Sequence, residues 1–251
     1  MRPRDWILIT LLFIIAIICV RLGFWQLDRR QERLSRNNWV ESQLSQPPII
    51  FGDEVISPEE WEYRKVDIKG DFQNEFTIAL RNRSYADQPG VHVVTPLKTN
   101  TEGKAVLVDR GWISNEDYIA DGLEPFRQIK SERFVGIVRL SQPEPTISFL
   151  ADPTREPGAP PRTEWRVLNV ERIQEQVPFD LYPFIVVMSE TIDTAQTMPI
   201  PNTLIDLSQG PHLSYAIQWF GFAGVAVVGG TAWWRKQVSR KDEIKDESST
   251  R

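Results

Sequence analysis

The sequence has one cysteine, Cys19, and two histidines, His92 and His212, among its 251 residues. A single cysteine excludes an intrachain disulfide and any zinc or iron–sulfur site built from several thiolates. The two histidines restrict imidazole chemistry to two positions in the chain. The formal net charge of −5 argues against a nucleic-acid partner, since proteins that bind nucleic acid present concentrated positive charge.

Lysine and arginine are absent from residues 173–234, and the last part of this range, residues 212–234, also lacks aspartate and glutamate. As a helix this uncharged stretch would cross a hydrocarbon core about 30 Å thick. A basic pair, Arg235-Lys236, follows it immediately. The sequence therefore predicts a transmembrane helix over residues 212–234.

A second apolar stretch, residues 6–20, follows Arg2 and Arg4 near the start of the chain. A basic start and an apolar core are also typical of a signal peptide, but no small-x-small cleavage site follows. We therefore expect an uncleaved transmembrane anchor over residues 6–27. Its uncharged part is short, so Arg21 would have to extend toward the membrane surface or face a partner.

Two transmembrane helices place both termini on the same side of the membrane. Four basic residues follow the second helix, and the excess of positive charge on cytoplasmic segments places this end in the cytoplasm. They are Arg235, Lys236, Arg240 and Lys241. We expect a cytoplasmic N-terminus (1–5), an extracytoplasmic domain (28–211) and a cytoplasmic tail (235–251). Five arginines oppose this orientation and need another explanation: Arg21, Arg29, Arg30, Arg33 and Arg36.

The segment between the two membrane helices shows the signals of a mainly antiparallel β domain of the α+β class. Residues 28–45 are expected to continue the first helix until Pro47-Pro48. Alternating or apolar runs predict strands over residues 63–69, 76–80, 91–95, 104–113, 133–140 and 184–188. Turns or loops are expected at Gly70-Asp71, 82–90, 99–103 and 141–163, with Pro96 ending a strand. Residues 170–177 predict a short helix with Asn169 as N-cap.

Polar aromatic residues lie at one end of the second transmembrane helix. The spacing i, i+3, i+7 and i+10 of His212, Tyr215, Trp219 and Phe222 places them on one helical face. One interpretation is an aromatic belt at the membrane surface with His212 as a helix cap. The other is a ligand-binding face.

Six short motifs, in order over residues 20–234, resemble those of the surfeit locus protein one family, known as Surf one in animals and Shy one in yeast. The motifs are Leu22-Gly-Phe-Trp-Gln-Leu-Asp-Arg-Arg30, Glu62-Tyr-Arg-Lys-Val-Asp-Ile-Lys-Gly-Asp-Phe72, Gly90-Val-His-Val-Val-Thr-Pro96, Val106-Leu-Val-Asp-Arg-Gly-Trp112, Gly136-Ile-Val-Arg139 and His212-Leu-Ser-Tyr-Ala-Ile-Gln-Trp219. The chain departs from the family at Gln209-Gly-Pro211, where an asparagine or similar polar residue usually precedes the histidine.

The resemblance implies an accessory protein, not an enzyme, that assists assembly of haem–copper cytochrome c oxidase in a bacterial plasma membrane. It implies contact with oxidase subunit I, with other assembly factors and with the lipid bilayer. For bacterial members it implies transient binding of haem a and its transfer to subunit I, with His212 as the ligand of the haem iron. The alternative is a membrane scaffold that stabilises an assembly intermediate without binding haem.

Under this topology, seven residues would gather where the two helices leave the membrane: Trp25, Gln26, Arg29, Arg30, His212, Tyr215 and Trp219. An imidazole can bind haem iron, aromatic rings can cover a porphyrin, and arginines can pair with its propionates. The alternative for the arginines is a solvated face or one that binds lipid headgroups. The alternative for Trp25 is a membrane-interface anchor.

Within the β domain, His92 and Asp109 could form a catalytic triad with a serine, but the sequence has no Gly-x-Ser-x-Gly motif and no phosphate-binding glycine loop. We expect His92 to be structural and Asp109-Arg110 to form a structural ion pair beside a turn. We expect Gly111 to be needed for the geometry of the backbone at that position. In the second membrane helix, Ala226-x-x-x-Gly230 would permit close contact with another helix.

Overall fold

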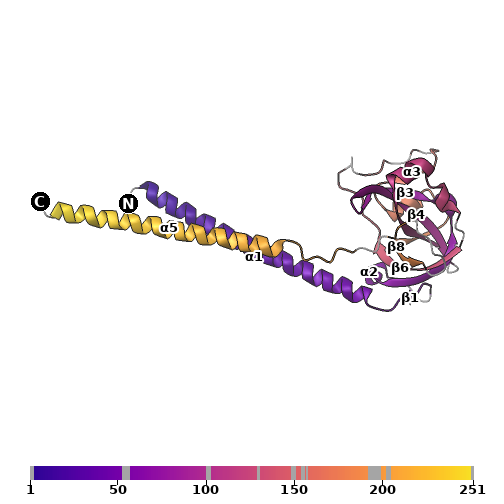
Figure 1. Cartoon of the computed structure of the whole chain (residues 1–251), viewed down its shortest axis with the longest axis horizontal. Coiled ribbons are helices and arrows are strands. Elements are labelled where there is room, and N and C mark those ends of the chain that lie inside the picture. Colours follow the sequence, from indigo (N-terminus) through magenta and orange to yellow (C-terminus); the bar gives the residue numbers. More distant parts are fainter. Residues whose placement is uncertain are drawn as a thin grey trace. The chain divides into compact units, whose positions relative to one another are not determined.

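The computed structural model describes residues 3–52, 57–99, 103–128, 131–147, 151–153, 156, 158–191, 199–201 and 205–249. The chain divides into two compact units. One comprises residues 1–39 and 206–251, and the other comprises residues 40–205. The first is a pair of long helices and the second is a β domain (Figure 1).

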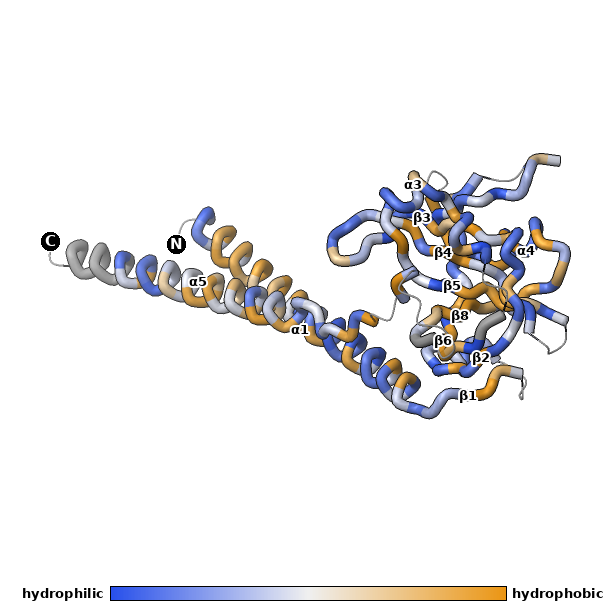
Figure 2. Tube along the Cα trace, turned by 45° about the vertical axis from the view of Figure 1, so that its right-hand side comes forward, coloured by the Kyte–Doolittle hydropathy of each residue, from blue (hydrophilic) through white to orange (hydrophobic). Residues whose placement is uncertain are grey.

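The helical unit is built from α1 (Pro3–Leu44) and α5 (His212–Ser249). The most apolar windows of these helices have mean hydropathies of 2.8 and 1.3, and both helices are long enough to cross a membrane. Hydrophobic residues predominate in the first part of α1, whereas in α5 they are interspersed with less hydrophobic ones, as Figure 2 shows. The chain is thus a membrane protein with two apolar helices, and α1 continues beyond its apolar part as predicted.

The two helices face each other along a seam whose residues are spaced alternately by four and three positions. This heptad spacing is typical of left-handed helix packing. The seam positions of α1 are buried or half-buried: Asp5, Ile9, Leu12, Ala16, Cys19, Gly23, Gln26, Arg30, Arg33 and Asn37. Those of α5 are His212, Ala216, Trp219, Ala223, Ala226 and Gly230.

Small residues allow close approach along this seam. A Cβ atom on Gly23 would lie 2.6 Å from Phe220 Cε1, and the Phe220 ring packs edge-on against Phe24 with centroids 5.4 Å apart. Farther along, Gly230 faces Leu12. The small-residue motif at Ala226 and Gly230 is therefore used for contact between the two helices of one chain.

The β domain contains eight strands in its described part: β1 (Ile49–Ile50), β2 (Lys65–Phe72), β3 (Ile78–Tyr85), β4 (Gln88–Thr99), β5 (Ala105–Ser114), β6 (Ser131–Leu140), β7 (Glu164–Trp165) and β8 (Leu181–Thr191). Short helices connect them: α2 (Pro58–Trp61), η1 (Asn74–Phe76), α3 (Asn115–Asp121), η2 (Glu124–Arg127) and α4 (Val170–Gln174). The Asn169 side chain caps α4 by accepting from the Arg172 amide, as predicted.

The sheet closes on itself, which the sequence did not predict. Its order is β1-β2-β6-β8-β5-β4-β3-β7, and a further pairing of β2 with β4 completes a barrel of β2, β6, β8, β5 and β4. Pairings are antiparallel except β1–β2, β3–β7 and β5–β8. The prediction of a mainly antiparallel β domain between two helices is confirmed.

Alternation along the strands supplies the core. Val66 and Ile68 of β2 are buried, as their spacing predicted, and pack with Val108, Phe134 and Phe184 from other barrel strands. A second cluster packs Trp165 and α4 against the sheet. Hydrophobic burial is the main driving force for closing such a barrel.

The turn expected at Gly70-Asp71 is wrong, because β2 continues through both residues to Phe72. Gly70 pairs with Glu132 on one side and Thr99 on the other. A Cβ atom at Gly70 would lie 2.3 Å from the Lys98 carbonyl oxygen. The glycine therefore permits a close strand crossing where the barrel closes.

The loop expected at residues 82–90 is also wrong, because β3 and β4 form a hairpin there. Its turn residues Ala86 and Asp87 have φ values of 47° and 62°, as in a type I′ turn. Pro96 does not end β4, because it lies between the β3 pairing that ends at Val94 and the β2 pairing that begins at Leu97. The predicted turn at 99–103 includes residues 100–102, which lie outside the described residues.

Candidate functional site

The first residue of α5 is held by a glutamine of α1. His212 Nδ1 lies 2.9 Å from Gln26 Oε1. Because an amide oxygen can only accept, Nδ1 must donate its proton to Gln26. In the neutral ring this leaves the lone pair on Nε2, the nitrogen that is free to bind a metal.

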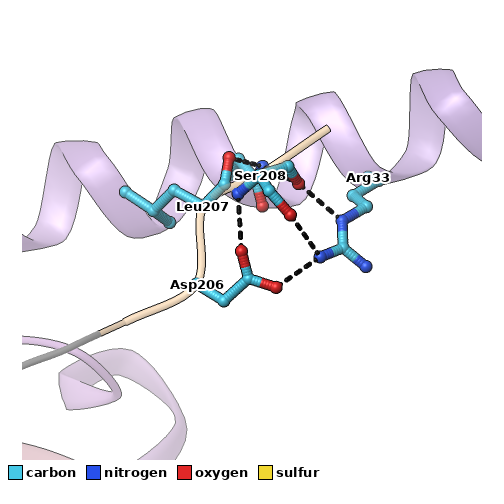
Figure 3. A network of polar contacts seen from close by, with 5 residues as sticks. Arg33, Asp206, Leu207 and Ser208 are labelled. Atoms are coloured by element: carbon cyan, nitrogen blue, oxygen red, sulfur yellow. Dashed lines mark hydrogen bonds and ion pairs between the residues drawn. The ribbon is translucent and has the colours of Figure 1, made fainter. Parts of the chain in front are cut away.

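The segment before His212 is fixed on α1 by a polar network (Figure 3). Arg33 Nε donates to the Ser208 carbonyl oxygen at 2.7 Å, and Arg33 Nη2 contacts Asp206 Oδ2 at 2.9 Å. Asn37 donates to the Leu207 carbonyl oxygen at 2.6 Å. The polar part of the α1 seam is therefore covered by an extended chain instead of by helix α5.

Two further contacts complete this network. Arg30 donates to the Gln209 side chain at 3.2 Å, and the Ser208 amide donates to Asp206 Oδ1 at 2.8 Å. The hydrogen bonds from Ser208, helped by Arg33, lower the pKa of Asp206 below its usual value. Asp206 is therefore ionised when it accepts these bonds at neutral pH.

Gly210 keeps the free edge of the imidazole open. Its φ of 68° lies in the left-handed region that favours glycine. A Cβ atom at this position would lie 3.6 Å from His212 Nε2. The Gln209-Gly-Pro211 sequence, in which this chain departs from the family pattern, thus turns the chain into α5 without covering Nε2.

Of the remaining predicted site residues, Trp219 belongs to the seam, whereas Tyr215, Trp25 and Arg29 are exposed beside it. Tyr215 and Phe222 are 46% and 57% exposed, while Trp219 is half-buried and packs edge-on against Phe222 at 5.9 Å. On α1, the exposed Arg29 lies 5.9 Å from the centre of the Trp25 ring. Among the described residues, the hydrogen bond of the His212 ring is to Gln26 and not to any of these side chains.

Of the seven predicted residues, the structure thus joins Gln26 to His212 and fixes Arg30 on the adjoining segment. Sequence reasoning missed the roles of Arg33, Asn37 and Asp206. The signal was present in α1, because Gln26, Arg30, Arg33 and Asn37 continue the alternating spacing of the apolar seam.

The β domain holds the other histidine in a buried pair. His92 Nδ1 donates to Asp109 Oδ2 at 2.8 Å, and Asp109 Oδ1 accepts from the Gly111 amide at 3.1 Å. Burial lowers the pKa of Arg83, an effect partly opposed by the charge of Asp109. The buried hydrogen bond between His92 and Asp109 agrees with the structural role expected for His92.

The neighbouring Arg110 is also buried. Its guanidinium lies 4.8 Å from the centre of the Phe72 ring, and Nη1 donates to the Phe126 carbonyl oxygen. The carboxylate of Asp109 pairs with His92. Among the described residues, no three His, Cys, Asp or Glu side chains are grouped as metal ligands.

Comparison with known proteins identifies the family of this chain. The model of the SURF1 family matches residues 13–224, which include most of α1, the β domain and the start of α5. The chain belongs to the SURF1 family. This membership implies a role in the assembly of cytochrome oxidase.

SURF1 relatives occur in bacteria and in animals. A SURF1-like protein of Rickettsia bellii is 28% identical over 259 residues, covering 100% of both chains. A SURF1-like protein of Rickettsia prowazekii is 30% identical over 217 residues, covering 84% of this chain and 83% of the relative. Surfeit locus protein 1 of Xenopus tropicalis is 25% identical over 258 residues, covering 95% and 78%.

Proposed function

We propose that this SURF1-family protein binds haem a transiently through His212 and aids its insertion into subunit I of cytochrome c oxidase. The observation that carries the proposal is the bond between His212 Nδ1 and Gln26. It orients the imidazole and leaves Nε2 as the nitrogen that would bind the haem iron. One protein ligand suits a carrier, because the cofactor must leave again.

The neighbouring side chains fit such a ligand. The lack of a Cβ at Gly210 leaves space beside Nε2. Exposed aromatic rings of Trp25 and Tyr215 can cover an apolar macrocycle, and exposed Arg29 can pair with a carboxylate. When bound, the haem would supply the iron that accepts the imidazole lone pair.

The proposal includes an orientation in the membrane. Arg235 and Lys236 follow the apolar part of α5, which supports a cytoplasmic position for this end and an extracytoplasmic position for His212. In this orientation Arg30 and Arg33 would lie on the outer side, where their bonds to residues 206–209 give them a structural role. We propose a bacterial plasma membrane as the location, with both termini cytoplasmic.

An absorption spectrum tests the haem role. The full chain is purified from cells that make haem a, beside His212→Ala and a control, Gln218→Ala, whose side chain is exposed on α5. We expect a visible haem band in the parent and control that is lost in His212→Ala, with equal helix content by circular dichroism. An undiminished band in His212→Ala would refute the role of this histidine.

A scaffold without haem is the second candidate. It is favoured by Arg30, which was expected to be available for a haem propionate and instead donates to the Gln209 side chain. Arg33 likewise fixes the segment before His212. Both candidates predict that the protein co-purifies with the oxidase. A parent protein that co-purifies but carries no haem, from cells making haem a, would select the scaffold.

A further inference from the structure

An apolar groove lies between α1 and α5 at the end remote from His212. Trp6, Ile9 and Leu12 line it on one side, and Ala226, Gly230 and Trp234 on the other. Its volume is about 400 Å³. Since Ala226 is 14 positions after His212 in the same helix, the groove begins about 21 Å from that residue.

One residue that lines the groove, the α5 seam residue Gly230, has no side chain. A Cβ added to Gly230 would only touch Leu12, at 3.7 Å, so a larger side chain could enter the open space. By contrast, a Cβ on the preceding Gly229 meets no atom within 4 Å, and that residue is exposed. Residues 229 and 230 therefore offer adjacent positions outside and inside the groove.

The groove suits a hydrocarbon chain because its lining is apolar along its length. Residues 226–234 extend it by roughly 12 Å along α5. It lies in the apolar parts of both helices, where the acyl chain of a lipid can occupy it.

Positive charge flanks the same end of the groove. Arg4 precedes Trp6 on α1, and Arg235 and Lys236 follow Trp234 on α5; all three are exposed. Arg235 also follows the groove-lining Thr231 by one helical turn. Basic groups between or beside membrane helices bind anionic lipid headgroups, while aromatic rings lie at the level of those headgroups.

We propose that this end of the helix pair is a binding site for one anionic phospholipid. An acyl chain fills the groove over Gly230, and the phosphate lies against Arg235 and the neighbouring cations. The site is independent of haem binding at His212. It selects by charge, which distinguishes it from the general contact between any membrane helix and lipid.

Native mass spectrometry of the full chain in neutral detergent tests the site. The protein is titrated with phosphatidylglycerol or phosphatidylcholine carrying identical acyl chains. We expect one phosphatidylglycerol to bind at least fivefold more tightly than phosphatidylcholine, since each cation contributes about this factor near a negative headgroup. Arg235→Gln should lower this preference about fivefold, and Arg240→Gln, farther along α5, should leave it unchanged.

The groove is tested by Gly230→Leu against Gly229→Leu. We expect Gly230→Leu to abolish the one-to-one lipid complex and Gly229→Leu to retain it, with equal helix content by circular dichroism. Equal affinity for both lipids, or equal behaviour of the two leucine variants, would overturn the proposal. A protein dimer that only Gly230→Leu dissociates would instead assign the groove to a second copy of the chain.

Discussion

Gln26 Oε1 and His212 Nδ1 are 2.9 Å apart, although 186 positions separate these residues in the chain. One belongs to α1, before the β domain, and the other begins α5, after it. The orientation of the imidazole therefore depends on the packing of two distant helices.

Replacing Gln26 by leucine removes this orienting bond while keeping a side chain of similar size. We expect the affinity for haem to fall about 10- to 100-fold, as is typical when the partner of a ligating histidine is lost. The measurement is a haem titration followed by absorbance. Gln31→Leu, at an exposed position of α1, is the control. An unchanged affinity in Gln26→Leu would show that the bond does not prepare His212 for iron.

Replacing Arg33 by glutamine should release the segment that precedes His212. Arg33 contacts both Asp206 and Ser208, so we expect the Ser208 amide to exchange its hydrogen about fivefold faster, the effect of losing one typical hydrogen bond. Hydrogen-exchange mass spectrometry measures this, with Arg29→Gln as a control on the same helix. Unaltered exchange would mean that the segment is held without Arg33.

The pH dependence of this segment follows from the lowered pKa of Asp206. A carboxyl group with a lowered folded pKa stabilises the structure above its unfolded pKa of about 3.9. That contribution is lost as the pH falls through the folded value. Protection of the Ser208 amide should therefore be equal at pH 5 and pH 7 once intrinsic exchange is corrected, and should disappear only below about pH 4.

Within the barrel, the stability that ionised Asp67 contributes should also be lost as the pH falls. Arg133 donates to both carboxylate oxygens of Asp67, at 2.9 and 2.6 Å, and this lowers its pKa. We expect Asp67→Asn to have a lower thermal midpoint than the parent at pH 7. The difference should vanish as the pH falls through the lowered pKa of Asp67. Asp121→Asn is the control, and a difference that persists in strong acid would contradict the ion-pair account.

The buried pair of His92 and Asp109 predicts a stability loss on truncation. Asp109→Ala leaves a buried imidazole donor without its acceptor, which costs about 1–3 kcal/mol. Asp109→Asn retains an acceptor and should cost less. Thermal unfolding followed by circular dichroism separates these variants. Equal stability of the alanine variant and the parent would show that His92 finds another partner.

Gly111 should tolerate substitution less well than another glycine with positive φ. Gly111 has a φ of 126°, and a Cβ there would lie 2.2 Å from the Ile200 carbonyl oxygen. Gly122 has a φ of 63°, but its added Cβ meets no atom within 4 Å. We expect Gly111→Ala to lose about 1–3 kcal/mol more stability than Gly122→Ala, because only Gly111 is crowded. Comparable thermal midpoints would contradict this steric account.

The sequence predicted those parts of the fold that depend on local pattern. Apolar runs located both membrane helices, and alternation located strands such as the one containing Val66 and Ile68. Closure of the barrel was not predictable in this way, because the pairing of Gly70 with Thr99 depends on contacts between distant strands. The predictions at Gly70 and Pro96 were wrong for the same reason. When only the neighbouring residues are considered, Gly70 resembles a turn and Pro96 resembles the end of a strand.

The candidate site was predicted only in part for a related reason. Helical spacing placed His212 with Tyr215 and Trp219, but the helix contact is made by His212, Ala216 and Trp219, which leaves Tyr215 exposed. Gln26 was among the expected site residues, whereas Arg33 was not. Its partners, Asp206 and Ser208, belong to a connector without regular pattern.

The parallel pairing of β5 with β8 has a consequence for biosynthesis. Ala105 pairs with Leu181, and β8 fills the place between β5 and β6 in the ring. A ribosome releases the strands in chain order, so the edges of β5 and β6 have no partner until residues 181–191 emerge. α5 begins only at His212. The β domain therefore cannot close until almost all of the chain before the second apolar helix has been made.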